Sequence, residues 1–243
     1  MKVEGIKVLL TGATSGIGEA LLMRLVANGN IIIAVGRDQS KLQQLEQYPK
    51  VISYSCDLTS PDSVQQLANF VVSQHSDLNL LINNAGIQHN YSFDANNAVS
   101  ASLIQEELQV NLLAPIHLTS LLMPILRANK NAAIVNITSA LGRVPKHDAA
   151  VYSSSKAGLS LFTKSLRLQS NAPLIVEAIP PLVETRMTSG RGRGKISADA
   201  CAMAIMKGLE KNQTTIAIGK IKALFFIQRF WPALAERLIN RPA

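Results

Sequence analysis

Tyr152 and Lys156 have the residue types and the spacing for proton transfer. Four positions apart in a helical segment, they lie on one face of that helix. A phenol with a pKa of about 10 is a poor acid–base catalyst near neutrality, but a neighbouring ammonium favours the phenolate. Ser139 follows the apolar run Ile134–Ile137, so its hydroxyl is expected at the carboxyl end of a strand, where open α/β sheets bind ligands. Because Tyr-x-x-x-Lys alone is common on protein surfaces, the interpretation depends on the motifs around it.

A glycine-rich segment, Thr11–Gly18 (TGATSGIG), joins the first apolar run to the first helical pattern. Glycine permits a tight turn and a close approach of the backbone to pyrophosphate, and the N–H groups and dipole of the helix start attract the anion. The spacing Gly-x3-Gly-x-Gly is a weak signal alone and also fits a plain turn. Its position at the first β–α turn predicts a dinucleotide site. The residues expected in that site are Gly12, Thr14, Ser15, Gly16, Ile17 and Gly18.

The end of the second apolar run, Val35-Gly36-Arg37-Asp38, bears on which dinucleotide is bound. A carboxylate there would bind the ribose diol of NAD, whereas an arginine accommodates the extra phosphate of NADP. Gly36 leaves room for that phosphate, and Arg37 supplies a forked cation suited to it. Asp38 is the counter-argument, although it also fits as the cap of a helix beginning near Lys41. We expect NADP(H) to be preferred, with NAD(H) as the alternative.

Short β-branched runs alternate with longer helical patterns, which is typical of a parallel sheet covered by helices on both faces. The runs are Ile6–Leu10, Ile31–Val35, Val51–Ser55, Leu78–Ile82, Ala132–Ile137, Leu174–Ile179 and Thr214–Ile218. The longest helical segments are 101–127, interrupted near Asn111–Pro115, then 149–169 and 198–211. This order predicts a doubly wound, Rossmann-type α/β three-layer sandwich with a mostly parallel seven-stranded sheet. We expect one domain, with a nucleotide-binding and catalytic part at 1–219 and a basic amphipathic helical tail at 220–243.

Together these motifs resemble the short-chain dehydrogenase/reductase family, in its shorter single-domain branch. The resemblance covers residues 3 to about 218, and the ordered set is more specific than any one motif. The matching segments are Thr11–Gly18, Asp57, Asn83-Asn84-Ala85-Gly86, Asn111, Ser139, Tyr152 with Lys156, and Pro180 to Thr185.

The resemblance implies roles for four residues. Tyr152 would donate a proton to a substrate carbonyl and act as the base in the oxidative direction. Ser139 would hydrogen-bond the substrate oxygen and stabilise its developing charge. Lys156 would bind the nicotinamide ribose and lower the tyrosine pKa, and Asn111 would orient a water that relays protons from Lys156. Without the family, Asn111 is simply a polar residue at a helix bend.

Further cofactor contacts are implied by the resemblance outside the glycine-rich turn. They are Asp57, Leu58, Asn83, Ala85, Gly86, Pro180, Val183 and Thr185, together with Tyr152 and Lys156. Asp57 also fits as a turn residue before Thr59-Ser60-Pro61. One departure is Pro180-Pro181 where the family usually has Pro-Gly, a variant similar to the Dlt-operon oxidoreductase group. Pro181 fixes φ and removes a donor, which affects placement of the nicotinamide more than the chemistry.

Composition excludes several classes of protein. Apolar residues make up 47% and charged residues 16%, which argues against disorder. Two cysteines suit a reducing compartment, and no signal peptide or uncharged stretch of about 18 apolar residues is present. A cytoplasmic location is therefore expected. No basic stripe is interleaved with aromatics, so no nucleic-acid partner is expected, and no metal site is predicted.

The net charge of +8 is concentrated late in the chain, where residues 190–243 contain ten basic and three acidic residues. Gly190–Lys195 fits a solvated loop or, alternatively, a contact for a phosphate or carboxylate on the substrate. A helical stripe in the tail consists of Ile227, Phe230, Trp231, Leu234 and Leu238, near Arg229 and Arg237. Packing against protein is the default for such a stripe, and contact with an anionic membrane surface is the alternative.

These observations predict an NADP(H)-dependent oxidoreductase that interconverts a carbonyl and a secondary alcohol. A catalytically silent NADP(H)-binding regulator and a peripheral membrane protein are the alternatives. Family analogy implies a homodimer or homotetramer paired through 101–127 and 149–169. The substrate is a small molecule that the sequence does not identify. Arg143, Lys146 and His147 fit as rim charges or as substrate contacts.

Overall fold

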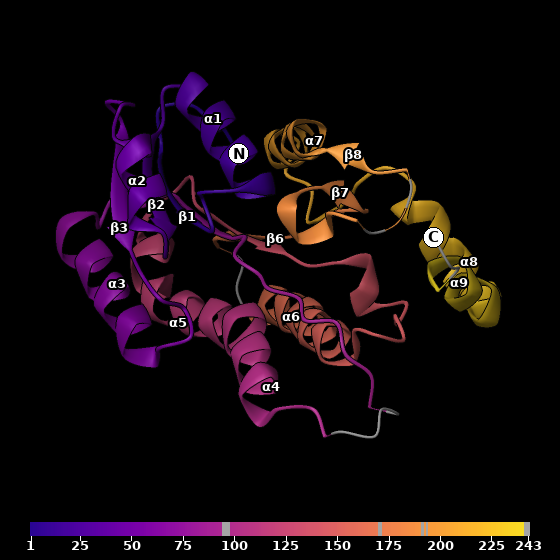
Figure 1. Ribbon diagram of the computed structural model, residues 1–243. Helices are drawn as coiled ribbons and strands as arrows, with labels where there is room; N and C mark the ends of the chain where they lie inside the picture. The colour runs from indigo at the N-terminus through magenta and orange to yellow at the C-terminus, as the bar shows by residue number, and fades with distance from the viewer. Residues whose placement is uncertain (94–97, 170–171, 191, 193, 241–243) are drawn as a thin grey trace.

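A sheet of seven strands forms the centre of the molecule, shown in the computed structural model (Figure 1). The structure describes residues 1–93, 98–169, 172–190, 192 and 194–240. The strands of this sheet are β1 (Lys7–Thr11), β2 (Ile31–Gly36), β3 (Val51–Ser55), β4 (Leu80–Asn83), β5 (Ala133–Ile137), β6 (Leu174–Ile179) and β9 (Thr215–Ala217). Every neighbouring pair in it is parallel, so this sheet is wholly rather than mostly parallel.

The strand order is β3-β2-β1-β4-β5-β6-β9. The chain moves outward from β1 to β3 and then returns to place β4 on the other side of β1. This reversal leaves a crevice at the carboxyl ends of β1 and β4, which is where doubly wound sheets bind ligands. The predicted fold class is therefore confirmed, and the topology locates the site.

Within the described residues, seven α-helices lie between the strands along the chain, and two more follow the last strand. They are α1 (Gly16–Ala27), α2 (Gln39–Leu45), α3 (Pro61–Gln74), α4 (Ala101–Leu108), α5 (Ala114–Ala128), α6 (Ala150–Gln169), α7 (Ala198–Glu210), α8 (Ile221–Phe230) and α9 (Pro232–Ile239). A second, two-stranded sheet pairs β7 (Val183–Glu184) with β8 (Ile196–Ser197), which the sequence did not predict.

Alternate residues of each strand enter two different cores. Val8 and Leu10 of β1 pack with residues of α1 and α7 on one face. Leu9, between them, packs with residues of α3 and α5 on the other. Because successive side chains of a strand point to opposite faces, a run that is apolar throughout has to be covered twice. The three layers follow from this requirement.

Local signals set where several helices begin. The Asp38 carboxylate accepts a hydrogen bond from the Lys41 amide at 3.2 Å, so its interpretation as a helix cap is confirmed. Ser60 caps α3 in the same way, with Pro61 at the first helical position, where its missing N–H costs nothing.

The predicted interruption near Asn111–Pro115 is a single π-helical turn, Gln109–Leu113, that joins α4 to α5 without breaking the helix. The whole run Ala101–Ala128 is long and apolar enough to cross a membrane by length and composition. In this fold it packs against α3 and α6. Such π-helical turns are rare and frequently occur at functional sites.

Candidate active site

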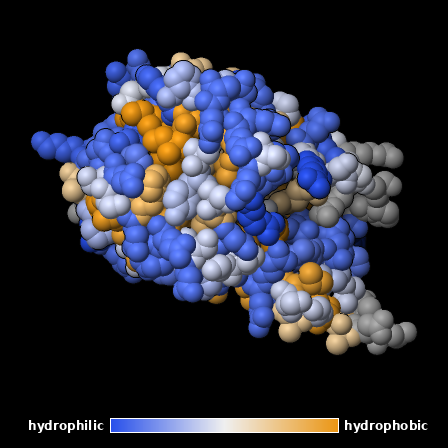
Figure 2. Space-filling model, turned by 60° about the vertical axis from the view of Figure 1, so that its left-hand side comes forward, coloured by the Kyte–Doolittle hydropathy of each residue, from blue (hydrophilic) through white to orange (hydrophobic). Residues whose placement is uncertain are grey.

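A cavity of about 350 Å³ opens in the crevice between β1 and β4. Its walls come from the β1–α1 turn, the ends of β2 and β3, the segment after β4, helix α6 and the segment after β6. Figure 2 shows a hollow in this face of the molecule with hydrophilic side chains at its border. Ligand sites in proteins commonly have volumes of this order, about 300–1,000 Å³.

The β1–α1 turn forms one wall of the cavity and depends on close backbone packing. Gly12 has φ +67°, a left-handed conformation that favours glycine. A Cβ on Gly18 would lie 2.0 Å from the carbonyl oxygen of Gly12, so no side chain fits there. The side chain of Ser15 does not cap α1, which leaves the first N–H groups of that helix without this partner. Such a helix start attracts an anion.

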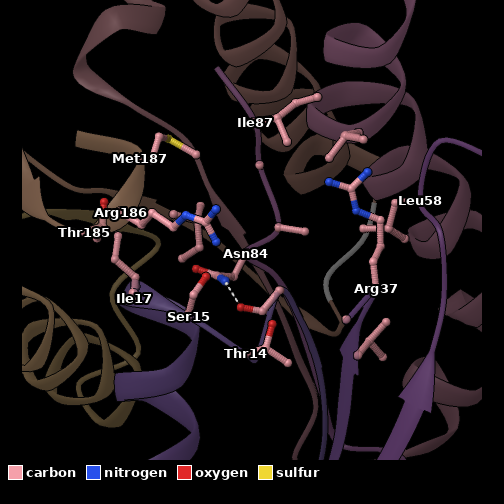
Figure 3. Close-up of a pocket in the computed structure, with 18 of the residues that line it drawn as sticks. Thr14, Ser15, Ile17, Arg37, Leu58, Asn84, Ile87, Thr185, Arg186 and Met187 are labelled. Carbon is pink, nitrogen blue, oxygen red and sulfur yellow. Dashed lines mark hydrogen bonds between the residues drawn. The ribbon is translucent and has the colours of Figure 1, made fainter. Parts of the chain in front are cut away.

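The segment after β4 is bonded to the glycine-rich turn. The Thr11 hydroxyl accepts hydrogen bonds from the amides of Asn84 and Ala85, both at 3.1 Å. The Asn84 side chain donates back to the carbonyls of Thr11 and Gly12, at 3.0 and 3.2 Å. Figure 3 shows Asn84 in the middle of the pocket, between Arg37 and Arg186. These bonds hold two walls of the cavity at a fixed separation.

Tyr152 and Lys156 both line the cavity from α6, and both are largely buried. The Lys156 Nζ lies 5.9 Å from the centre of the tyrosine ring. It also donates a hydrogen bond to the Ile137 carbonyl at 3.0 Å. Burial lowers the pKa of the Lys156 ammonium to about 8, because a low-dielectric surrounding disfavours charge. The structure therefore supplies the cation near the phenol that the sequence predicted.

Asn111 lies in the π-helical turn, fully buried. Its amide oxygen accepts from the Ile87 amide at 2.9 Å, and its nitrogen donates to the Ile87 carbonyl at 2.8 Å and to the Ser155 hydroxyl at 3.3 Å. The side chain thus ties the segment after β4 to α6. Gly86, in the segment after β4, lies close to both Asn111 and Lys156. A Cβ on Gly86 would be 3.2 Å from the Asn111 oxygen and 3.5 Å from Lys156 Nζ.

Ser139 is half-buried directly after β5, as expected, but it is not among the residues that line the cavity. Its hydroxyl accepts a hydrogen bond from the Leu141 amide at 3.1 Å and caps a short 3₁₀ turn, Ala140–Gly142. That turn lies against α6, because a Cβ on Gly142 would be 2.8 Å from the carbonyl carbon of Lys156. The preceding residue, Thr138, does line the cavity.

A buried carboxylate supports this segment from β6. The Thr138 hydroxyl donates to Glu177 at 3.0 Å, and Arg143 forms an ion pair with the other Glu177 oxygen at 3.3 Å. Arg143 also lies 4.2 Å from the centre of the Phe225 ring in α8. Arg143 therefore links the sheet to the tail, while 31% of its side chain remains exposed.

The opposite wall carries the residue expected to select the dinucleotide. The Arg37 side chain is 57% exposed, and its guanidinium lies 3.7 Å from a Glu106 oxygen. Leu58 and Cys56 line the cavity beside it. Asp57, between them, is exposed, and its carboxylate accepts from the Thr59 amide at 3.0 Å. The turn role that the sequence allowed for Asp57 is the one its side chain has here.

Most of the predicted cofactor contacts converge on the cavity, and four do not line it. Those that line it are Gly12, Thr14, Ser15, Gly16, Ile17, Arg37, Leu58, Ala85, Gly86, Tyr152, Lys156, Pro180 and Thr185. The four others are Gly18, Asp57, Asn83 and Val183, of which Gly18 acts through backbone packing. The Asn83 side chain is buried in the sheet and donates to Asn136 at 2.8 Å, so Asn84 is the asparagine that faces the cavity.

Sequence reasoning missed several residues that line the cavity. The main ones are Thr138, Arg186, Met187 and Ile87. Figure 3 shows Arg186 reaching in from the side of Thr185 and Met187, opposite Arg37. Its position directly after Thr185, a residue already expected in the site, was the available signal. The pocket therefore carries two guanidinium groups on opposite walls.

The predicted basic loop lies partly outside the described residues, which exclude Arg191 and Arg193. Lys195 is described, and its ammonium donates to the Thr188 carbonyl at 2.6 Å. Near the Ser139 segment, Lys146 forms an ion pair with Asp148 at 2.6 Å, and the His147 amide donates to Asn240 at 2.9 Å. Among the described residues, no group of three or more His, Cys, Asp or Glu gathers as metal ligands do.

Comparisons with known proteins agree with this geometry. A family model described as short chain dehydrogenase matches residues 7–195. An uncharacterised oxidoreductase of Bacillus subtilis (strain 168), DltE, is 31% identical, with 92% of each chain covered. A short-chain dehydrogenase from Burkholderia cenocepacia, solved in complex with NADP, is 25% identical, with a TM-score of 0.86 and complete coverage of both chains. A short-chain dehydrogenase/reductase from Burkholderia phymatum in complex with NAD is 21% identical, with a TM-score of 0.84, covering 100% of this chain and 98% of that one.

Proposed function

The chain belongs to the short-chain dehydrogenase family, and from that premise we propose that it interconverts a carbonyl and a secondary alcohol with NADP(H). Membership of this family establishes that the protein is of the oxidoreductase class. The cofactor preference, the direction of reaction and the roles of individual residues are the proposal. Its principal support is the convergence of the Tyr152–Lys156 pair and the glycine-rich β1–α1 turn on one cavity.

The cavity fits a nicotinamide dinucleotide in two respects. The turn from Gly12 to Gly18 is closely packed and borders the cavity at the start of α1, whose first N–H groups suit a pyrophosphate. Arg37 at the end of β2 provides a forked cation where the 2′-phosphate of NADP would lie. When bound, the dinucleotide would supply or accept the hydride.

Tyr152 is positioned to move the proton that accompanies hydride transfer. In reduction its hydroxyl would protonate the substrate oxygen, and in oxidation the phenolate would remove that proton. The ammonium of Lys156 near the ring favours the phenolate, which eases proton donation in reduction and raises the fraction of phenolate available as the base in oxidation. Ser139, which directly follows the cavity-lining Thr138, would donate a hydrogen bond to the oxygen of a bound substrate, an interaction that strengthens as charge develops there. Since its hydroxyl accepts from Leu141, its own proton remains free for donation.

The decisive experiment is the substitution Tyr152→Phe, measured with NADPH and a panel of carbonyl compounds. Loss of the phenol proton should lower kcat by at least about a hundredfold, while the Kd for NADPH changes little. Tyr48→Phe, a partly buried tyrosine outside the cavity, is the control and should retain full activity. If Tyr152→Phe retains turnover, the proposed acid is wrong. If NADPH binds and no carbonyl or alcohol turns over, the silent regulator is the better description.

A further inference from the structure

The two C-terminal helices, α8 and α9, present an apolar surface that nothing in the described chain covers. We call the exposed side chains Phe226, Phe230, Trp231, Leu234 and Leu238 the tail surface; their exposed fractions lie between 36% and 59%. The Phe226 and Phe230 rings are 4.9 Å apart between centres, and Trp231 lies 5.9 Å from Phe230. Contiguous exposed apolar side chains of this kind commonly mark an interaction site.

The opposite side of the same helices is fixed to the body of the molecule. Ile221 packs with Ala140 and Ile179, and the Asn240 amide donates to the Pro145 carbonyl at 3.1 Å. Figure 1 shows α8 and α9 lying side by side at one end of the molecule, away from α3. The tail surface is therefore the outer face of a pair of helices that is attached to the body through Ile221 and Asn240.

Cations accompany the tail surface. Lys222, Arg229 and Arg237 are exposed on α8 and α9, and Glu236 is the one acidic residue in these two helices. The Arg229 guanidinium lies 5.8 Å from the centre of the Phe230 ring. Symmetric contact between two copies would bring both sets of cations together, with one carboxylate in each copy to offset them. Contact with an anionic surface would instead neutralise them.

We propose that the tail surface docks on anionic lipid bilayers. Aromatic side chains flanked by arginine and lysine are the pattern of helices that lie in the membrane interface. The apolar rings would enter the headgroup region, and each cation would gain electrostatic free energy near the charged surface. Because α8 packs on the segment that carries Ser139, docking would hold that segment close to the membrane. This role is separate from the proposed reaction and does not depend on it.

Trp231 makes the test direct, because it is the one tryptophan of the chain and lies in the tail surface. Its emission should shift to shorter wavelength when the full-length protein meets vesicles of phosphatidylcholine with an equal amount of phosphatidylglycerol. Vesicles of phosphatidylcholine alone should give little shift. The protein should co-sediment with the anionic vesicles, and high salt should weaken that binding because the charges are exposed.

Variants separate the charge from the apolar contribution. Lys222→Gln with Arg229→Gln should weaken co-sedimentation about twenty-five-fold, or about fivefold for each cation. Phe226→Ser with Phe230→Ser, which keeps Trp231, should weaken it by at least about tenfold. The matched control is the double variant Met203→Ser with Lys207→Gln, which changes an exposed apolar residue and an exposed cation on α7. This variant should bind anionic vesicles as the wild type does. NADPH binding in every variant shows that the fold is intact.

Two results would overturn the proposal. One is that the wavelength of Trp231 emission does not change when anionic vesicles are added to a protein that still binds NADPH. The other is that Trp231 emission shifts with protein concentration in the absence of lipid, and that this shift disappears in the Phe226→Ser, Phe230→Ser variant. That result would mean that a second copy of the chain covers the tail surface.

Discussion

The position of Lys156 sets its proposed role against its burial. The proposed proton transfer needs an ammonium beside the phenol of Tyr152, yet burial lowers the lysine pKa to about 8 from its ordinary value of 10.5. Between these two values the unfolded chain binds a proton that the folded chain does not. The free energy of unfolding therefore rises with pH between about 8 and about 10.5. Below pH 8 the folded protein bears the full free-energy cost of burying the Lys156 ammonium.

We predict that Lys156→Met abolishes turnover and stabilises the protein without cofactor. The shift corresponds to about 3 kcal/mol, and loss of the hydrogen bond to the Ile137 carbonyl offsets about 1 kcal/mol of that. The free energy of unfolding should therefore rise by about 2 kcal/mol at pH 7. The gain should shrink towards zero by about pH 10, as measured by urea titration.

Lys164→Met, at an exposed position of the same helix, is the control and should change stability by less than about 0.5 kcal/mol at any pH. A Lys156→Met variant less stable than the wild type by the same amount at pH 7 and pH 10 would contradict the buried-charge interpretation.

Arg37 and Arg186 lie on opposite walls of the cavity and should act on different parts of the dinucleotide. We predict that Arg37→Gln raises the Kd for NADPH about tenfold or more and leaves that for NADH nearly unchanged, because charge-assisted hydrogen bonds to the 2′-phosphate are lost. Arg186→Gln should weaken both dinucleotides alike, since it lies on the side of the glycine-rich turn. Fluorescence titration with each dinucleotide measures both effects.

Glu106→Gln provides the complementary comparison, because it removes the carboxylate that lies 3.7 Å from the Arg37 guanidinium. NADPH should bind this variant a few-fold more tightly, a modest effect for an exposed ion pair. Equal or better binding of NADH than of NADPH by the wild type would refute the assignment of Arg37.

Among the elements, the β1–α1 turn has the least tolerance for added atoms. We predict that Gly18→Ala raises the Kd for NADPH at least about tenfold and lowers the free energy of unfolding by about 2 kcal/mol. Its methyl group would lie 2.0 Å from the Gly12 carbonyl oxygen and 2.6 Å from the Asn84 amide nitrogen. The turn and the segment after β4 would both have to move.

Gly5→Ala separates this clash from backbone strain. Gly5 has φ +64° with no other atom within 4 Å of an added Cβ. Alanine there should cost about 1–2 kcal/mol from the left-handed conformation alone, with NADPH binding unchanged. Normal NADPH affinity in Gly18→Ala would show that the close packing of the turn is not what shapes the site.

At the scale of the whole molecule, α6 exposes an apolar stripe on the side away from the sheet. Leu161 and Leu168 are seven residues apart, hence on one face, and are 65% and 90% exposed. Exposure of this extent favours a subunit contact through α6, in line with the dimer implied by the sequence. This contact is distinct from the tail surface at the end of the molecule.

We predict that the wild type is a dimer at micromolar concentration and that Leu161→Lys with Leu168→Lys gives a folded monomer. Burying two like-charged stripes against each other is unfavourable, so association should be lost. Sedimentation velocity measures the change, and Met203→Lys on α7 is the control that should remain dimeric. A monomeric wild type, or a dimer that survives the double substitution, would place the contact elsewhere.

Much of the fold was available from local patterns. The alternation of apolar runs with helical segments predicted the parallel sheet, because strands covered on both faces are apolar throughout. Asp38 could be interpreted as a cap from its position before Lys41, since capping depends on near neighbours in sequence. The short β7–β8 sheet was missed because two-residue strands have no periodicity to detect.

Sequence alone determined the fold class, because the alternation of apolar runs and helical segments continues along the whole chain. It also determined the glycine-rich turn and the Tyr152–Lys156 pair, because each is encoded by residues within a few positions of one another. Only the tertiary structure decided that Arg186 and Thr138 line the cavity, that Asn84 rather than Asn83 faces it, and that Asp57 turns to its own loop. Only it showed that Arg143 is bound by Glu177 and that one side of α8 packs beside Ser139 while the other stays exposed. These outcomes depend on contacts between segments far apart in sequence, which no local pattern encodes.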